Sequence, residues 1–293
     1  MGDMLVIEGF YDQLTPVGSN RHQRAGFRAP KGFSFACSAQ QLPIAGSELM
    51  RAAATLPLVF RAHRDRTWSV RALTSLIPEH NHYVLQRSGR LRAAFTPLAL
   101  QTYPFAKVYD KRREASVLCI DEPALVGADE EEAQPLFEGE GGQVSSAVRR
   151  KARLIERLER EQKQLSKAAA VLAEAQLLEP WPMEVRIGSE QTHTLRGLYR
   201  IRAEALREIS DGEKLTHLQS EGALELAYAQ RVSQQQMRKL KHWADQWRYH
   251  ENRQKRLIED SLPVSNDEEI QFDWGQLDLG GDDEHEANRN PKE

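Results

Sequence analysis

The fold is decided by residues 145–178, which read SSAVRRKARLIERLEREQKQLSKAAAVLAEAQLL. A serine, Ser145 or Ser146, stands where a helix N-cap is expected, and Pro180 and Pro182 prevent continuation. The stretch therefore predicts a long amphipathic helix that covers a core. Its apolar residues recur at offsets of three and four, which places them on one helical face: Val148, Ala152, Ile155, Leu158, Leu165, Ala169 and Leu172.

The opposite face of this predicted helix is basic. Two pairs with i, i+4 spacing, Glu156 with Arg160 and Glu159 with Lys163, each add a few tenths of a kcal/mol. Basic side chains on such a face can bind the phosphate groups of a nucleic acid, so nucleic-acid binding is one alternative function. The face carries Arg149, Arg150, Lys151, Arg153, Arg157, Arg160 and Lys163 against Glu156, Glu159 and Glu161.

A second long helix is predicted over residues 221–262, and the polar run at 233–236 weakens its apolar stripe. Trp243 and Trp247 lie on that stripe, where they pack on a core or bind a partner helix. In the acidic tail that follows, Phe272 and Trp274 indicate a docking motif, or a segment that folds back onto its own domain. We predict that these four aromatic residues bind a partner.

The remaining patterns predict an α+β fold. Its N-terminal region is mixed and strand-rich with short helices, and two long helices that flank a small strand pair follow, before a disordered acidic C-terminal tail. A helix is expected at 47–56 and a helical turn at 202–208. The expected strands are 33–37, 58–61, 68–73, 83–86 and 116–120, with the strand pair at 183–187 and 193–201.

Composition suggests five parts. Residues 127–142 hold six acids and no base, which is typical of a solvated loop or linker. We therefore predict a strand-rich part at 1–126, an acidic linker at 127–143, a helical and strand remainder at 144–237, a helical extension at 238–262 and a disordered tail at 263–293.

Charge is distributed unevenly along the 293 residues. The whole chain has a formal net charge of −3, but the ten acids and two bases of residues 263–293 give the tail −8, which leaves +5 for residues 1–262. No apolar run reaches the ~20 residues that span a bilayer, and the first residues lack a secretory pattern, so we expect a cytoplasmic protein. Cys37 and Cys119 lie in apolar contexts outside metal spacing and indicate buried, free thiols.

Two groups of residues are candidates for chemistry. Arg21-His22 and Asp121-Glu122 could form a polar site, because a His–carboxylate pair performs general acid–base catalysis near neutral pH. His22, Asp121 and Glu122 are thus the catalytic candidates. A structural salt-bridge network is the alternative interpretation.

The second group is Glu79, His80 and His82, which could bind a divalent metal if it lies on a strand. The letters HNH at 80–82 spell a nuclease motif, but no helix with a further ligand follows, so we reject that reading. Partly exposed loop histidines are the alternative. The sequence contains no Walker A, GxGxxG, HExxH or GxSxG motif and identifies no cofactor.

Nine short motifs, in order, resemble the bacterial SapC family. The resemblance covers about residues 20–240 and implies an α+β domain of this length, with no established catalytic mechanism. The family's name comes from a surface-layer context, and members occur beside outer-membrane receptor genes. The motifs are NRH at 20–22, FSFA at 33–36, LPI at 42–44, LPLVF at 56–60, YPF at 103–105, CIDE at 119–122, PLF at 135–137, LLEP at 177–180 and GALELAYA at 222–229.

This chain also departs from the family pattern. Gln101-Thr102 replaces an arginine pair, and Gln230 stands where the family often has histidine. Ala72-Leu73 and the segment 81–83 differ as well. Any catalytic role of these positions in the family is therefore in doubt here.

We accordingly expect a SapC-like accessory or interaction protein with a protein partner and no membrane span, linked to surface-layer or outer-membrane uptake systems. The alternatives are a metal- or His-dependent enzyme of unknown substrate and a nucleic-acid-binding protein. The long helices also offer a surface for oligomerisation.

Overall fold

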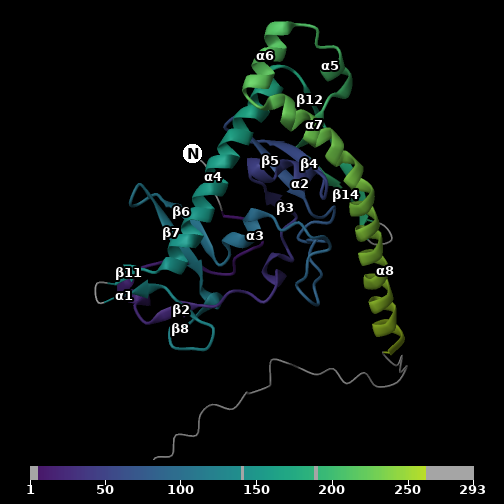
Figure 1. Cartoon of the computed structure of the whole chain (residues 1–293). Helices are drawn as coiled ribbons and strands as arrows, with labels where there is room; N and C mark the ends of the chain where they lie inside the picture. The colour runs from purple at the N-terminus through teal and green to yellow at the C-terminus, as the bar shows by residue number, and fades with distance from the viewer. Residues whose placement is uncertain (1–5, 140–141, 188–190, 262–293) are drawn as a thin grey trace, which may run out of the picture. The chain divides into compact units, whose positions relative to one another are not determined.

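The computed structural model describes residues 6–139, 142–187 and 191–261. Met1–His250 form one compact unit, and Glu251–Glu293 form a second. The chain has the α+β fold that the sequence predicts, with short strands and helices followed by two long helices (Figure 1). The predicted acidic tail, with Phe272 and Trp274, lies outside the described residues.

A five-stranded antiparallel sheet organises the first unit. Phe60 lies opposite Val70 in the register of the two central strands, β4 and β5, which are the strands predicted at 58–61 and 68–73. Successive side chains of a strand point to opposite faces, so both faces of β4 can contribute to a core. The strand order is β12 (Leu178–Pro180), β15 (Leu198–Ile201), β4 (Leu58–Ala62), β5 (Trp68–Leu73) and β3 (Gln41–Pro43).

Apolar clusters lie on both faces of this sheet. On one face, Leu58 and Phe60 pack with residues of α2 (Leu49–Ala53), α4 (Ser146–Glu174) and α7 (Ala223–Ser233). On the other face, Val59 packs with the hairpin of β13 (Met183–Ile187) and β14 (Gln191–Leu195) and with the first half of α8 (Met237–Ser261). The hairpin confirms the strand predicted at 183–187, but the strand predicted at 193–201 is divided at Gly197: its first part belongs to β14, and its last part is β15 of the five-stranded sheet.

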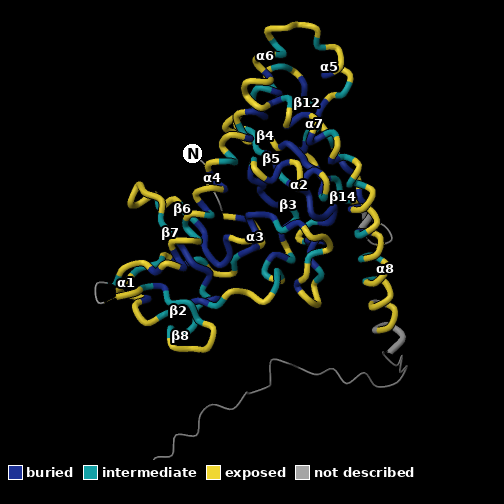
Figure 2. The backbone as a smooth tube through the Cα atoms, viewed as in Figure 1, coloured by how far each residue is buried: buried dark blue, intermediate teal, exposed yellow. Residues whose placement is uncertain are grey.

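The helix α4 confirms the prediction from residues 145–178. Ser145 is the N-cap, and its side chain accepts a hydrogen bond from the Val148 N–H at 3.2 Å. The C-terminal half packs on the five-stranded sheet through Leu165, Ala169 and Leu172. The N-terminal half packs on a different cluster, and Figure 2 shows buried and exposed residues alternating along the helix.

That different cluster, which we call the small-sheet core, contains Phe27, Phe105, Ile120, Leu136, Ala147, Val148 and Ile155. Two three-stranded sheets supply it. One has the order β1 (Leu14–Pro16), β7 (Ala115–Asp121) and β6 (Phe105–Asp110), and the other has the order β8 (Leu125–Gly127), β2 (Ala25–Phe27) and β9 (Gln134–Pro135). The strand predicted at 116–120 is β7.

The acidic stretch 127–143 is partly structured. It contributes β9, β10 (Phe137–Glu138) and the start of β11 (Gln143–Val144). Leu136 is fully buried between them, and its N–H donates to the Ala25 carbonyl at 3.0 Å. The PLF motif, an apolar island among acids, was the signal for this packing. The five-part division of the chain stays a prediction.

Two predicted strands are wrong. Residues 33–37 contain the 3-10 helix η1 (Ser34–Ala36), because the Phe33 and Ser34 carbonyls accept from Ala36 and Cys37 within the same turn. Residues 83–86 contribute one isolated bridge, Val84 to Leu91, before the chain turns at Ser88-Gly89. In both segments the apolar side chains pack in a compact turn, and the backbone does not form a β-ladder.

The second long helix is also not continuous. α7 ends at Ser233, a 3-10 turn η4 (Gln234–Gln236) follows, and α8 begins at Met237. The buried Ser233 hydroxyl donates to the Gln230 carbonyl at 2.6 Å and accepts from the Leu58 N–H at 2.9 Å, which fixes the end of α7 to the sheet. The polar run that weakened the apolar stripe is therefore a bend.

Some of the short helices were predicted from the sequence, and others were missed. The helix expected at 47–56 is η2 (Gly46–Glu48) followed by α2, and the expected turn at 202–208 is α5 (Ala203–Arg207). The sequence analysis missed α1 (Ser19–His22), α3 (Leu98–Thr102) and α6 (Gly212–Ser220). Asp211 caps α6 by accepting from the Glu213 and Lys214 N–H groups, a signal that was present in the sequence.

Candidate functional site

The two catalytic candidate motifs meet in the structure, although about 100 residues separate them. Arg21, in α1, donates to the Glu122 carboxylate at 2.6 Å. Neighbouring His22 is buried, and its Nδ1 accepts from the Gly18 N–H at 3.2 Å. Burial and the nearby Arg21 lower the pKa of His22, against the opposing effect of Glu122. His22 is therefore held neutral, with a proton on Nε2.

Asp121 belongs to a different network from Glu122. Its buried carboxylate accepts from the Asp12 and Gln13 N–H groups at 3.0 and 2.9 Å. Its other oxygen accepts from the Tyr103 hydroxyl at 3.0 Å. We call these groups the Asp121 network. With three donors around one buried carboxylate, Asp121 fastens the N-terminal segment to β7.

Aromatic rings surround the Asp121 network. The Tyr103 ring stacks on Phe35, with centroids 3.9 Å apart and planes 10° from parallel, and on Tyr11 at 6.1 Å. Burial, with the hydrogen bond to Asp121 and its negative charge, raises the pKa of Tyr103 above its ordinary value. Burial raises the pKa of Tyr11 as well. Both phenols are therefore neutral donors.

The metal candidates Glu79, His80 and His82 lie in a turn rather than on a strand. His80 Nδ1 donates to the Pro78 carbonyl at 2.8 Å, and His82 Nδ1 is hydrogen-bonded to the Ser75 hydroxyl at 3.2 Å. The two rings are 6.1 Å apart. Within the described ranges, no group of three or more His, Cys, Asp or Glu side chains is arranged to hold a metal ion.

Trp247 of α8 covers this histidine pair. Its ring lies edge-on to His80, with centroids 4.5 Å apart, and 6.1 Å from His82. Burial, followed by the charges of His80 and Arg92, lowers the pKa of His82 to about 4. The Nε2 atom of His82 is buried without a hydrogen-bond partner. His82, His80, Trp247 and Arg92 are called the His82 cluster below.

Trp243, one turn before Trp247, also faces inward. The Arg92 guanidinium lies 5.4 Å from its ring centroid, and Tyr83 lies 6.3 Å away. Both tryptophans are half-buried and pack on the sheet clusters. The structure thus brings Trp247, a predicted partner residue, together with His80 and His82, and the two tryptophans pack the first half of α8 on the sheet within the first unit.

Gln230 explains one departure from the family pattern. Its buried side chain accepts from the Ile201 N–H and donates to the Leu58 carbonyl, both at 3.1 Å. The amide therefore bridges β15 and β4 from α7. Here this position is structural.

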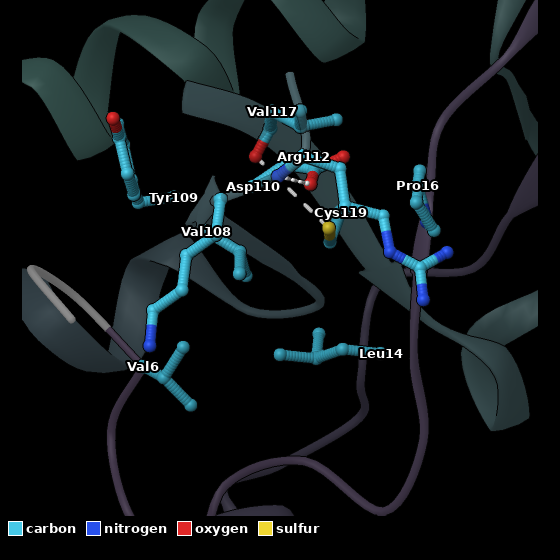
Figure 3. A pocket seen from close by; sticks show the side chains of 10 residues that line it. Val6, Leu14, Pro16, Val108, Tyr109, Asp110, Arg112, Val117 and Cys119 are labelled. Carbon is cyan, nitrogen blue, oxygen red and sulfur yellow. Dashed lines mark hydrogen bonds between the residues drawn. The ribbon is translucent and has the colours of Figure 1, made fainter. Parts of the chain in front are cut away.

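A cavity of about 460 Å³ lies on the sheet that contains β6 and β7 (Figure 3). Leu14, Val108 and Val117 make it apolar, and the Cys119 sulfur faces it. Burial and the nearby Asp110 raise the pKa of the Cys119 thiol, which disfavours a nucleophilic thiolate. Lys111 and Arg112 also line this cavity, and we call it the β6–β7 cavity.

The exposed face of α4 is basic, as predicted. We define the α4 basic face as Arg149, Arg150, Arg153, Arg160, Lys163 and Lys167; all six are exposed. At 1.5 Å per residue it runs for about 27 Å. Glu159 forms its predicted pair with Lys163 at 3.9 Å, whereas the structured part of the chain shows no ion pair between Glu156 and Arg160.

Two residues that were predicted to belong to this face, Lys151 and Arg157, instead form contacts within the fold. Lys151 donates to the carbonyls of Gln101 and Tyr103 at 2.7 and 2.8 Å, and burial lowers its pKa. Arg157 pairs with Glu161 at 2.8 Å. In contrast, none of Arg149, Arg150, Arg153 and Arg160 has an acidic side chain within ion-pair distance among the residues with described positions.

Comparison with known proteins agrees with the nine motifs. A family model described as SapC matches residues 17–240, which is most of the chain, so the protein belongs to the SapC family. No curated protein matches it. No solved structure matches it either. None of the helices in the described ranges is long and apolar enough to span a membrane.

Proposed function

We propose that this SapC-family chain is a non-catalytic accessory protein that binds an acidic protein partner through the α4 basic face. A link to surface-layer or outer-membrane uptake systems belongs to the same proposal and rests on the family's context alone.

The observation that carries the proposal is a row of four arginines on the α4 basic face that have no acidic partner among the described residues. Arg149, Arg150, Arg153 and Arg160 are exposed, and α4 is held in place by three apolar clusters beneath it. Long cationic side chains on a rigid helix present charge to a partner without a prior change of the backbone. Electrostatic complementarity of this kind increases the rate of association and sets the partner's orientation.

The environment of the catalytic candidates supports a role in binding over one in catalysis. Asp121 is enclosed by three donors, and Glu122 is paired with Arg21. A general base must reach the proton that it removes, and these groups are instead engaged within the fold. In this proposal Trp243 and Trp247 hold α8 in place, and docking by Phe272 and Trp274 stays a separate prediction.

The two alternative functions make different predictions. A nucleic-acid-binding protein would also use the α4 basic face, but it would prefer a duplex to an acidic polypeptide, with an affinity that falls steeply as salt increases. A metal-dependent enzyme would be purified with a stoichiometric divalent metal that is lost when His80 and His82 are replaced.

The test measures binding of labelled poly-glutamate and of a 20-base-pair DNA duplex to the full chain by fluorescence anisotropy. We expect saturable binding of poly-glutamate in preference to the duplex, and a loss of tenfold or more in the triple variant Arg149→Glu, Arg153→Glu, Arg160→Glu.

The matched control is Arg24→Glu, Arg87→Glu, Arg90→Glu, which changes the net charge equally at exposed sites outside α4. We expect it to retain the native affinity within about threefold, since screening weakens distant charges. Preference for the duplex, or equal losses in both triple variants, would contradict the proposal.

A further inference from the structure

A second cavity lies where α4 passes the free part of the β5 edge. β3 pairs with Arg71, Ala72 and Leu73, so the earlier residues of β5 have no strand on that side. There the Ser166 hydroxyl of α4 donates to the Trp68 carbonyl. The space between the two elements has a volume of about 750 Å³, which is in the usual range for small-ligand sites. We call it the β5–α4 groove.

Cations outnumber acids around this groove. Arg64 and Arg71 come from the β4–β5 hairpin and β5, and Lys163 and Lys167 come from α4. In the part of the chain that the structure describes, no acidic side chain lies within ion-pair distance of Arg64, Arg71 or Lys167. Lys163 has the single, long contact of 3.9 Å with Glu159.

Both acids that line the groove are already engaged. Asp65 accepts from the backbone N–H and the hydroxyl of Thr67, at 3.1 and 2.7 Å. Glu159 accepts from Lys107 at 2.6 Å, a residue of β6 outside the groove. Among the described residues, neither carboxylate forms an ion pair with Arg64, Arg71 or Lys167.

The cations also act on one another. Burial, followed by the charge of Arg61, lowers the pKa of Arg71 to about 10. Burial and the charges of Arg71 and Arg61 lower the pKa of His63, whose Nε2 is hydrogen-bonded to the Ser69 hydroxyl at 2.8 Å. Arg71 is partly buried, and its repulsion by the exposed cations around it is relieved when an anion binds between them.

The floor of the groove is apolar. Trp68, Val70 and Leu165 line it, and the Trp68 ring is held edge-on to Tyr199 with centroids 5.0 Å apart. A fixed aromatic ring provides a flat surface for an apolar or aromatic group. The groove thus combines an apolar floor with a cationic rim.

We infer that the β5–α4 groove binds a small organic anion, with a carboxylate or phosphate group among Arg64, Arg71 and Lys167 and an apolar, aromatic body against Trp68. This site goes beyond the proposed partner binding, because it is a concave small-ligand site and its hairpin residues lie outside the α4 basic face.

The test is isothermal titration of the full chain with phenyl phosphate, benzoate, inorganic phosphate and phenol. We expect one-to-one binding of phenyl phosphate or benzoate, at least tenfold tighter than inorganic phosphate, and no measurable binding of phenol. The comparison of phenyl phosphate with benzoate identifies which anionic group the groove prefers. No saturable binding of either aromatic anion, or equal binding of phenol, would overturn the inference.

Four variants locate the site. Lys167 is exposed, and Lys167→Glu should weaken binding of the aromatic anion by tenfold or more. Lys111→Glu, at the β6–β7 cavity, should change this affinity by less than threefold. Arg71→Gln should also weaken binding, with recovery in Arg71→Lys. Equal losses in Lys167→Glu and Lys111→Glu would place the ligand elsewhere.

Partner binding by the α4 basic face and anion binding in the β5–α4 groove can be tested independently. The triple variant at Arg149, Arg153 and Arg160 should lose poly-glutamate and keep phenyl phosphate, because none of the three lines the groove. Loss of both ligands in that variant would contradict a distinct site.

Discussion

The Asp121 network and the His82 cluster are both buried polar sites, yet they are built in opposite ways. The Asp121 carboxylate accepts from three donors, whereas His82 leaves Nε2 buried without a partner beneath an aromatic ring. The first site is stabilised by a charge that is fully hydrogen-bonded. The second is stable only while its imidazole stays neutral. The difference shows that burial alone does not indicate how a polar site responds to substitution or to pH.

The largest effect should come from Asp121→Ala. This change leaves the Tyr103 hydroxyl and two backbone N–H groups unpaired, and each buried donor left unsatisfied typically costs about 1–3 kcal/mol. We expect the free energy of unfolding in urea to fall by at least about 3 kcal/mol. Glu122→Gln is the adjacent control, and because the pair with exposed Arg21 is worth less than about 1 kcal/mol, a similar loss there would contradict the role of Asp121.

The His82 cluster should make stability depend on pH. The folded pKa of about 4 lies below the ordinary 6.5, so the unfolded chain binds more protons between these values. Stability should therefore fall as the pH decreases through this window, by about 3 kcal/mol at 1.36 kcal/mol per pKa unit. The measurement is urea unfolding from pH 7 to pH 4.

The variant His82→Asn isolates this contribution, because all other titrating groups are shared with the native chain. We expect its stability to change less over the same pH window. Identical pH profiles for the two proteins would show that His82 titrates normally in the folded state.

A smaller effect is expected from Trp247→Ala. The ring is half-buried, so its loss should cost about 2 kcal/mol, less than the 3–5 kcal/mol of a fully buried aromatic residue. Removing the cover also admits water to His82, and its pKa should rise toward 6.5 in an NMR titration. An unchanged pKa would mean that the turn itself, rather than α8, excludes water from the imidazole.

Periodicity predicted the elements that have one apolar face and a clear boundary. α4 has seven apolar positions at helical spacing and a serine cap, and β4 and β5 are short apolar or β-branched runs. The same logic failed at 33–37 and 83–86, where the apolar side chains pack in a compact turn. It also failed at Ser233, because the hydrogen bond that bends the chain is made to Leu58.

The candidate sites show the same limit. The motifs that carry His22 and Glu122 were identified, but only the pairing of β1 with β7 and the position of α1 bring Arg21 to Glu122. The β5–α4 groove was missed because its cations come from a hairpin and from a helix about 100 residues later. The run HRDR at 63–66 and the i, i+4 pair Lys163 and Lys167 were its signals.

The packing of the two ends of α4 on separate apolar clusters, with Leu158 in a third between them, has a consequence for cooperativity. Because one uninterrupted helix closes both the small-sheet core and the five-stranded sheet, neither cluster can lose α4 without straining the other half of the helix. The two clusters should therefore unfold together as one cooperative unit, with similar amide hydrogen-exchange protection at Val148 and at Leu172.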